Sequence, residues 1–493
     1  MTTSEIGILI AIIVYMVGVV GIGVYFAKKN STTNDFYLGG RKLGPLVTAM
    51  SAEASDMSSW LLMGLPGVAY VTGVCDAFWT AAGLAVGTYS DVCSAITIPD
   101  FFANRYRDPK MLKCVSAIII IIFFVPYTAS GFAACGKLFN SLFGVDYLTA
   151  MIISAIVIVA YTTLGGFLAA STSDFIQSII MSIALVIVLS YGIISVGGFD
   201  GVVAHVGDLK GFLSITSTHD GATNAATPYS VLSIASTLAW GLGYFGMPHI
   251  LLRFMAIEDT KKLKLSRRVA SVWVVISMSV AVSIGIIGYA MSAEGVIPNL
   301  KDSETIIVQI AHVLSTHGII FAIIAGVILA GILASTMSTS DSQLLAASSS
   351  VSENLLEGVL SLNLSSGVKI VVARGSVIII SIIAMFLASN PNSSVFQIVS
   401  FAWAGFGATF GPVMLFALFW KRSNKYGAIS GMVAGGIMIF VWKFLVRPMG
   451  GVLGIYELLP AFIVASIFIV VVSLLTPAPE KEIVDEFESI KNY

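Results

Sequence analysis

Residues 51–67, SAEASDMSSWLLMGLPG, lie inside a long apolar segment that extends from Leu46 to Val71. The segment has the length of a membrane-crossing helix, yet it carries Glu53 and Asp56 among four serines. Acidic groups at bilayer depth are costly, so they normally face a protein interior and serve a path for ions or substrate. Small polar residues followed by Gly-x-Pro-Gly favour a broken helix with free backbone carbonyls. The stretch therefore predicts a cation site with Asp56 as its nearby negative charge. The alternative is an ordinary helix whose serines bond back to their own carbonyls.

The composition of the whole chain indicates an integral membrane protein. Of 493 residues, 57% are hydrophobic and 11% charged, and the mean hydropathy is +0.94. That is too little charge to cover a soluble surface of this size. The formal charge of −1 argues against a nucleic-acid partner, and the four cysteines lack the spacing of a metal site. A lipid bilayer is therefore the expected surrounding.

Apolar runs of about 20 residues recur along the chain and predict an all-α protein with about thirteen transmembrane helices. The third of them, Asp76–Tyr89, is only about 21 Å long at 1.5 Å per residue, short of the ~30 Å hydrocarbon core. Either this helix borrows residues from the preceding turn or a piece of sequence is missing near Tyr89. The predicted spans are 5–27, 45–72, 74–90, 111–140, 147–170, 172–197, 228–254, 266–292, 304–340, 369–389, 394–420, 426–446 and 452–475.

The positions of the basic residues predict how the helices are oriented. With the N-terminus outside the cell, only Lys137, Lys210, Lys301, Lys443 and Arg447 lie outside. The other 21 of the 26 basic residues then lie on the cytoplasmic side. An odd number of spans also places the tail, residues 476–493, in the cytoplasm.

Two more stretches combine polar residues with weakened helix. In Phe167–Gln177, Asp174 lies just inside a predicted span, either as a helix cap or as an ion ligand. In Ala239–Arg253, three glycines and Pro248 predict an unwound span. Trp240 and Tyr244 of that stretch could form the wall of an apolar substrate pocket, although core packing is the commoner role of such residues.

Hydroxyl groups crowd the stretch Ala334–Leu345, ASTMSTSDSQLL. Their oxygens suit a hard cation such as Na⁺, whereas Ser and Thr also serve as contacts between helices. Ser400–Pro412, rich in glycine and aromatic residues, suits a hinge or gate. The broken spans 45–72 and 228–254 open successive groups of five spans with opposite orientation, which is the layout of an inverted-repeat transporter.

Several of these motifs together resemble the solute:sodium symporter family, over residues 5–475. Within the family the match is closest to the bacterial sodium/proline symporters of the PutP type. The motifs are DFYLGGRKLGP (35–45), SDMSSWLLMGLPG (55–67), IPDFFANRY (98–106), YTTLGGFLA (161–169), WGLGYFGMPHILLRFM (240–255), STMSTSDSQLL (335–345) and FAWAGFGATFGPV (401–413).

The resemblance implies a transporter rather than an enzyme, with a single transmembrane domain, residues 1–475. It also implies a LeuT-like core of two five-helix inverted repeats, 45–197 and 228–420. One extra helix, 5–27, precedes the core, and two helices, 426–475, follow it. The protein would take up L-proline by alternating access across a bacterial cell membrane, with Na⁺ as the coupling ion and without a cofactor or an obligate protein partner.

By matching positions, the resemblance also implies the binding residues. The sodium site would use the carbonyls of Ala54 and Met57 and the hydroxyls of Ser338 and Thr339. Asp56 would be an essential carboxylate there, and Asp174 would take part in sodium handling. The proline pocket would involve Trp60, Tyr127, Trp240, Tyr244, Pro248 and Met247.

The pocket prediction leaves room for other functions. Met247 stands where the family usually has Gln, so the chain could instead carry another amino acid, a carboxylate or a sugar with Na⁺. A membrane sensor or a channel on the same scaffold is a more distant alternative, because a sensor needs an attached signalling domain and the tail is too short for one.

Overall fold

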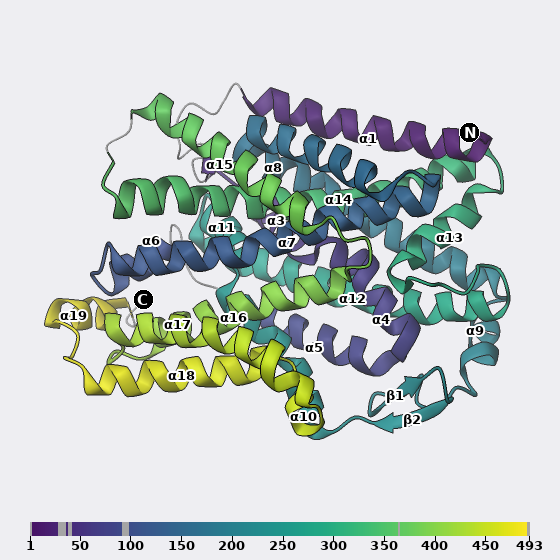
Figure 1. Ribbon diagram of the computed structural model, residues 1–493. Helices are drawn as coiled ribbons and strands as arrows, with labels where there is room; N and C mark the ends of the chain where they lie inside the picture. The colour runs from purple at the N-terminus through teal and green to yellow at the C-terminus, as the bar shows by residue number, and fades with distance from the viewer. Residues whose placement is uncertain (1, 28–35, 38–41, 91–97, 363–364, 491–493) are drawn as a thin grey trace.

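A computed structural model describes residues 2–27, 36–37, 42–90, 98–362 and 365–490. Its helices lie side by side along one direction, with the two termini at opposite ends of the bundle (Figure 1). Nine helices among the described residues are long and apolar enough to cross a membrane. In chain order the elements are α1 (Thr3–Ala27), α3 (Pro45–Ser59), η1 (Trp60–Gly64), α4 (Leu65–Thr72), α5 (Val74–Ser90), α6 (Ile98–Arg105), α7 (Met111–Phe143), α8 (Tyr147–Ser195), α9 (Phe199–Val206), β1 (Ser217–Asp220), β2 (Ala225–Pro228), α10 (Val231–Leu238), η2 (Ala239–Gly246), α11 (Pro248–Met255), η3 (Thr260–Lys262), α12 (Leu263–Ala293), η4 (Ser303–Thr305), α13 (Ile306–Ser315), α14 (Ile319–Ser349), η5 (Ser350–Val359), α15 (Ser366–Leu387), α16 (Val395–Phe419), α17 (Lys425–Val441), η6 (Trp442–Val446), η7 (Arg447–Met449), η8 (Gly451–Gly454), α18 (Leu458–Leu475) and α19 (Lys481–Ile490).

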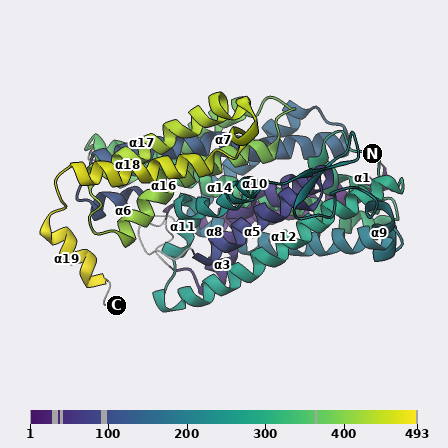
Figure 2. The same cartoon turned by 90° about the horizontal axis from the view of Figure 1, so that it is seen from below.

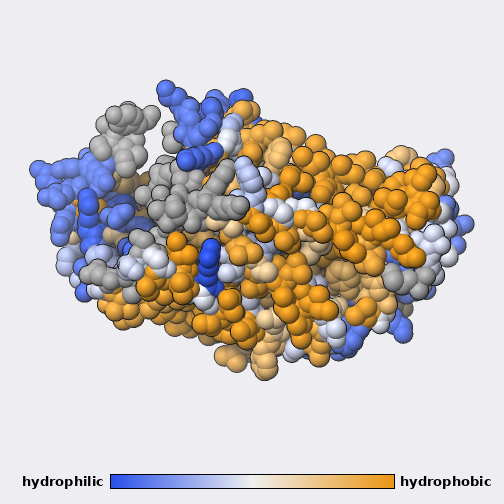
Figure 3. Space-filling model, turned by 90° about the horizontal axis from the view of Figure 1, so that it is seen from above, coloured by the Kyte–Doolittle hydropathy of each residue, from blue (hydrophilic) through white to orange (hydrophobic). Residues whose placement is uncertain are grey.

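The surface of the bundle has the polarity that a bilayer requires. Apolar side chains cover the middle of the face in Figure 3, and hydrophilic ones gather at its two ends. Large apolar residues such as Val14, Ile379 and Ile437 are more than half exposed. In water such exposure would be unfavourable, so the chain is a multi-pass membrane protein. The count of thirteen spans stays a prediction.

The first broken helix is interrupted at Ser58. This residue has φ 48° and ψ −171° inside the predicted span 45–72, and the chain continues through the wide turns of η1 into α4. Few residues other than glycine adopt a positive φ, and such strain tends to occur at functional sites. The prediction of a helix break in this span is therefore correct.

The second broken helix spans α10, η2 and α11. Its middle, η2, is a tight 3₁₀ segment of eight residues. Met247 then adopts an extended conformation, and α11 begins at Pro248. Three glycines in η2 and a proline without an N–H explain why regular α-helix stops here. The predicted unwinding of this span is also correct.

Helix α8 is two antiparallel legs joined at Gly166. Its 49 residues would extend about 74 Å as a straight helix, more than twice the hydrocarbon core. Ala150 of the first leg lines a crevice together with Glu5 of α1. The ring of Tyr191 in the second leg contacts the ring of His317. Two residues earlier, the carbonyl oxygen of Ser315 accepts a hydrogen bond from the hydroxyl of Ser4 in α1. Both outer ends of α8 therefore lie beside the start of α1.

The position of this reversal corrects the predicted boundary near residue 171. Gly166 has φ 62° and ψ −162°, a conformation that is essentially restricted to glycine. Hydropathy places the boundary about five residues too late, because apolar residues flank the turn on both sides. Asp174 consequently lies more than a turn beyond the start of the second leg, so its reading as a helix cap is wrong.

We expect Gly166→Ala to lower the free energy of unfolding by about 1–3 kcal/mol, because a Cβ makes this backbone conformation costly. The unfolding midpoint of the purified protein in detergent measures the loss. Gly375→Ala in α15 is the matched control, because its added Cβ would meet no atom within 4 Å. Equal midpoints for the two variants would contradict a strained turn at Gly166.

The ninth predicted span, 304–340, is displaced in the structure. Residues 306–315 form the separate helix α13, Gly318 has φ 120°, and α14 with η5 extends from Ile319 to Val359. The serine-rich half of this helix is buried in the protein, and there polar side chains are tolerated. A hydropathy profile therefore ends this span too early.

The structure also bears on the short third span and on the segment 198–227. α5 begins at Val74, directly after Gly73, so the short third helix does take residues from the preceding turn. Residues 91–97, beside the suspected gap near Tyr89, lie outside the described residues. The segment 198–227, which connects the predicted spans 172–197 and 228–254, contains α9 and most of the hairpin formed by β1 and β2, in which Ser217 pairs with Pro228.

The described part of the predicted tail, residues 476–490, packs against the helix bundle. It forms α19 at the C-terminal end of the molecule (Figure 2), where Phe487 is buried. The guanidinium of Arg105 in α6 lies over the ring of Phe487 at 5.1 Å.

Candidate functional site

The two helix breaks meet in the interior of the bundle. Tyr244 of η2 donates a hydrogen bond to the carboxylate of Asp56, 188 residues earlier in the chain. His249 of α11 lies 3.2 Å from the carbonyl oxygen of Ser55 through Nε2. Side chains of the second broken helix thus contact the first one beside its break, as in transporters whose site lies between two discontinuous helices.

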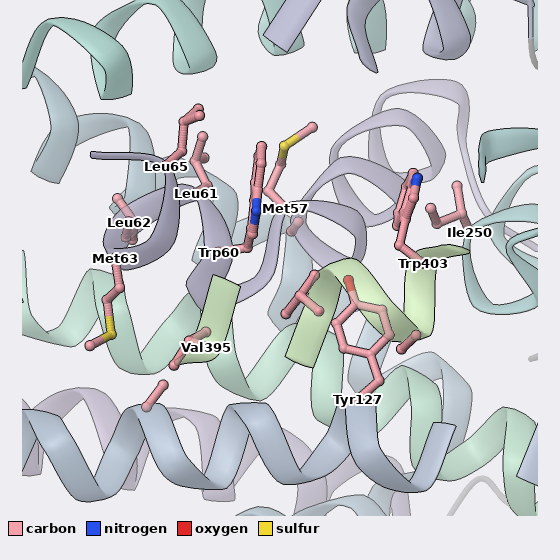
Figure 4. Close-up of a cluster of buried hydrophobic side chains, with 14 of the residues drawn as sticks. Met57, Trp60, Leu61, Leu62, Met63, Leu65, Tyr127, Ile250, Val395 and Trp403 are labelled. Carbon is pink, nitrogen blue, oxygen red and sulfur yellow. The ribbon is translucent and has the colours of Figure 1, made fainter. Parts of the chain in front are cut away.

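A small cavity lies beside this junction. It is lined by one carboxylate, four aromatic side chains and three aliphatic ones: Asp56, Met57, Trp60, Leu84, Tyr127, Trp240, Val399 and Trp403. Figure 4 shows Trp60, Tyr127 and Trp403 in this region, contributed by different parts of the chain. The cavity measures about 10 Å³, which is room for about one water molecule.

Stacked aromatic rings separate this cavity from a wider hollow. The ring centroid of Trp60 lies 5.5 Å from that of Trp240 and 6.0 Å from that of Phe396. Phe396 also lines a polar hollow of about 430 Å³, together with Lys137 and Glu304. Lys137 is one of the five basic residues predicted to lie outside. A movement of these rings would therefore connect the inner cavity to that side.

The four predicted sodium ligands lie on the broken helix α3 and on α14. Ser338 Oγ is 2.7 Å from the carbonyl oxygen of Ala54, so these two are in direct contact. Thr339, next to Ser338, bonds through its hydroxyl to the carbonyl of Ser335 at 3.1 Å. Met57 immediately precedes the break at Ser58, where helical hydrogen bonding is interrupted. The structure thus brings one carbonyl of α3 against one hydroxyl of α14, while the carbonyl of Met57 accepts a hydrogen bond from the N–H of Trp60.

Asp174 lies on α8, beside this oxygen cluster, and is fully buried. Its Oδ2 accepts hydrogen bonds from Ser51 at 2.8 Å and from Ser55 at 3.2 Å. Arg253 of α11 forms an ion pair with the same oxygen at 3.0 Å. From the sequence, Arg253 is assigned only to the cytoplasmic basic residues, because no local pattern links it to a residue 79 positions earlier.

The structure places the predicted pocket residues in two groups. Trp60, Tyr127 and Trp240 line the small cavity. Tyr244 lies behind the lining, where it contacts Asp56 and the ring of Trp403. Met247 and Pro248 are buried but do not line it.

Three lining residues were missed by sequence reasoning: Leu84, Val399 and Trp403. Trp403 lies within the glycine-rich stretch Ser400–Pro412, which was interpreted only as a hinge or gate. The signal that could have found Trp403 is the same one that marked Trp240, an aromatic residue beside glycines in a membrane span.

Comparisons with known proteins identify the family to which the chain is similar. The model of the Sodium:solute symporter family matches residues 36–435. The osmoregulated proline transporter OpuE of Bacillus subtilis is 40% identical to the chain, with 97% of this chain and 96% of that protein covered. The high-affinity proline transporter PutP of the same organism is 41% identical, with 96% and 98% covered. The sodium/proline symporter of Haemophilus influenzae is 39% identical, with 97% of each chain covered.

Solved structures share the fold at low sequence identity. A Na⁺-coupled sialic acid symporter in its outward-open state superimposes with a TM-score of 0.78 at 17% identity, covering 96% of this chain and 99% of that one. The nucleobase-cation-symport-1 family transporter Mhp1 does so with a TM-score of 0.52 at 14% identity, covering 92% and 98%. The predicted fold class, a helical membrane protein with a LeuT-like core, is confirmed, and the hairpin of β1 and β2 is the exception to an all-α chain.

Proposed function

The chain belongs to the sodium:solute symporter family, and we propose that it couples the inward movement of Na⁺ to the uptake of L-proline by alternating access. The observation that carries the proposal is the pair of broken helices. Between them lies a cavity with one carboxylate among aromatic rings, next to an oxygen cluster suited to Na⁺.

The chemistry of the cavity favours a small, partly apolar amine. Proline has a compact hydrocarbon ring and a cationic secondary amine. Trp60, Trp240 and Trp403 offer flat apolar faces, which also attract cations. Asp56 supplies a negative charge that the amine and Na⁺ can share. The relatives at about 40% identity that are named as proline transporters support the same choice.

The oxygen cluster provides what Na⁺ needs. In the proposal, the carbonyls of Ala54 and Met57 and the hydroxyls of Ser338 and Thr339 bind the ion. The hydroxyl of Ser338 already lies against Ala54 and would turn its oxygen lone pairs toward the cation. Because two ligands come from each helix, the ion draws α3 and α14 together and orders the break beside the pocket.

Transport requires the aromatic rings to move. The cavity of about 10 Å³ is too small for proline, so the rings of Trp60, Trp240 and Phe396 separate to admit it from the outer hollow. The N-terminus and this hollow face outside, as the distribution of basic residues indicates. After the outer rings close, the opposite side opens and releases proline and Na⁺ into the cytoplasm.

The electrical driving force is sufficient for concentrative uptake. Each ~100 mV of membrane potential contributes about 2.3 kcal/mol per positive charge moved inward. Since a tenfold change in concentration ratio corresponds to about 1.4 kcal/mol, ~100 mV alone supports a proline gradient of roughly fiftyfold. A sodium gradient adds to this value.

Uptake of radiolabelled L-proline into proteoliposomes tests the proposal. We expect accumulation that depends on an inward Na⁺ gradient and that is inhibited only by unlabelled proline and close analogues. Sodium-driven accumulation of a different solute would support Na⁺ coupling and would show that the substrate is not proline. Uptake that does not respond to Na⁺ would contradict the proposed function.

We expect Gly243→Ala to weaken proline binding between about fivefold and a hundredfold, since overpacking of a core costs about 1–3 kcal/mol. Its Cβ would lie 1.9 Å from Nε1 of Trp403, the atom that holds the Trp403 ring by donating to the carbonyl of Trp240 at 2.8 Å. The KM for proline in the uptake assay measures the effect.

Gly436→Ala in α17 is the control for this substitution, because the nearest atom to its Cβ would be Cγ2 of Thr409 at 3.5 Å. A Gly243→Ala protein with the KM of the control would show that Trp403 does not shape the proline pocket.

A further inference from the structure

Tyr456 connects the last two long helices, α17 and α18, to the wall of the small cavity. It lies just before α18 begins at Leu458. Its ring is stacked on the ring of Trp240, with the centroids 5.1 Å apart and the planes inclined by 16°. Both side chains are buried. Trp240 lines the cavity and Tyr456 does not, so Tyr456 is one ring removed from the proposed proline pocket.

Trp240 is also in contact with the rings that close the cavity. Its centroid lies 5.5 Å from that of Trp60 and 5.6 Å from that of Phe396. Aromatic pairs at such distances stabilise each other beyond the area that they bury. Among the rings in contact with Trp240, that of Tyr456 lines neither the small cavity nor the outer hollow. Tyr456 therefore holds Trp240 without being in the path of the solute.

Two hydrogen bonds fix the position of Tyr456. Its backbone N–H donates to Oγ of Ser236 in α10 at 2.8 Å, in the first part of the second broken helix. Its hydroxyl donates to the carbonyl oxygen of Ser400 in α16 at 2.7 Å, at the start of the stretch interpreted as a hinge or gate. Since an unpaired buried polar group is costly, the ring of Tyr456 cannot turn away from Trp240 without a loss of free energy.

The residues on either side of Tyr456 anchor it further. Glu457 is fully buried and forms ion pairs with Arg447 at 2.7 Å and with Lys443 at 3.6 Å. The carbonyl oxygen of Ile455 accepts a hydrogen bond from Nε1 of Trp442 at 3.2 Å. Removing one partner from a buried ion pair is strongly destabilising. The segment that carries Tyr456 is therefore a rigid support for its ring.

We infer that Tyr456 is a positioning residue that fixes Trp240 in the pocket wall and thereby sets the size of the solute ring that the transporter accepts. Because protein interiors are close-packed, a fixed ring against Trp240 limits how far Trp240 moves back when a solute enters. The pocket then accepts the five-membered ring of proline and rejects the six-membered ring of pipecolate, which has one more methylene. The inference rests on the proposed function, since it concerns the selectivity of that proline pocket.

The ring-size selectivity of Tyr456→Leu tests the inference. In the unmodified protein we expect the inhibition constant of L-pipecolate against proline uptake to exceed the KM for proline at least about tenfold, as one methylene can achieve. Leucine remains apolar but has no flat ring, so Trp240 can move back. The KM for proline should then rise about two- to tenfold, the contribution of one aromatic pair. Inhibition by pipecolate should not weaken, so the ratio of the two constants falls by the same factor.

Two matched variants separate this role from general packing. Tyr456→Phe keeps the stacked ring and loses only the bond to Ser400, so we expect both constants within about twofold of the unmodified protein. Phe440→Leu removes a ring of α17 that contacts Phe123 at 6.0 Å and Phe401 at 5.4 Å but does not line the cavity. Its ratio should be that of the unmodified protein. If Tyr456→Leu does not fold, Tyr456→Met replaces it, because methionine adapts to fill the space without a flat face.

Each outcome has a definite meaning. Equal affinity for the two solute rings in the unmodified protein, or an unchanged ratio in a folded Tyr456→Leu or Tyr456→Met protein, would overturn the inference and leave sodium-coupled proline uptake intact. A fall in the ratio of the same size in Tyr456→Phe or in Phe440→Leu would also overturn it, because the stacked ring would then not be the cause. No sodium-driven proline uptake in the unmodified protein would instead contradict the proposed function.

Discussion

Asp56→Asn is expected to lower Na⁺-dependent proline uptake by up to about a hundredfold. Asp56 is 5% exposed, is the one carboxylate that lines the small cavity, and accepts a hydrogen bond from Tyr244. Asparagine has nearly the same shape, so the substitution removes the charge and leaves the packing. A lost interaction with a charged group costs up to about 3 kcal/mol, which corresponds to about a hundredfold.

Initial rates of radiolabelled proline uptake in proteoliposomes, measured over a range of Na⁺ concentrations, give the size of this effect. Asp146→Asn is the control, because Asp146 caps α8 at the surface by accepting from Thr149, and asparagine caps helices equally well. Tyr244→Phe keeps the Asp56 charge and removes one donor to it, so a loss of about tenfold is expected. Uptake by Asp56→Asn within about twofold of the control would refute the role of this carboxylate.

Replacement of Ser338 and Thr339 together by alanine is expected to raise the Na⁺ concentration needed for half-maximal uptake at least about a hundredfold. The double variant removes both hydroxyl ligands that α14 would contribute to Na⁺. Each lost contact with a charged group costs about 1.5–3 kcal/mol, and about 1.4 kcal/mol corresponds to tenfold. The maximal rate at saturating Na⁺ should fall less than the apparent affinity.

The Na⁺ activation curve of uptake provides the measurement, and Ser335→Ala provides the control. Ser335 is as buried as Ser338, but its hydroxyl bonds only to the carbonyl of Ile332 in its own helix at 2.8 Å. Its removal should change the curve by less than about twofold. If the double variant and the control had the same curve, the sodium site would have to lie elsewhere.

The sequence was informative wherever structure depends on neighbouring residues. The break in the first span follows from the serines and glycines around Ser58, and the unwinding of η2 follows from its three glycines and Pro248. Apolar runs of sufficient length located most membrane helices to within a few residues. These properties are set by local backbone preferences and by the thickness of the bilayer, so they can be predicted without knowing how the chain packs.

Where glycine geometry or burial overrides hydropathy, the sequence was less informative. The reversal at Gly166 is predicted near residue 171, because hydropathy alone does not fix its position; the observed φ of 62° does. The extension of α14 to residue 359 depends on serines that are buried between helices and not exposed to lipid. Hydropathy averages over the residues in a window, and it cannot distinguish these environments.

The sequence by itself determined that this is a helical membrane transporter and, through its motifs, which oxygen-bearing residues are candidates for Na⁺. Tertiary structure alone decided which of these residues meet. Ser338 reaches Ala54 across 284 positions, Trp403 joins the pocket beside Trp240, and Arg253 pairs with Asp174. Such contacts arise from the packing of helices that are distant in the chain, and no local pattern encodes that packing.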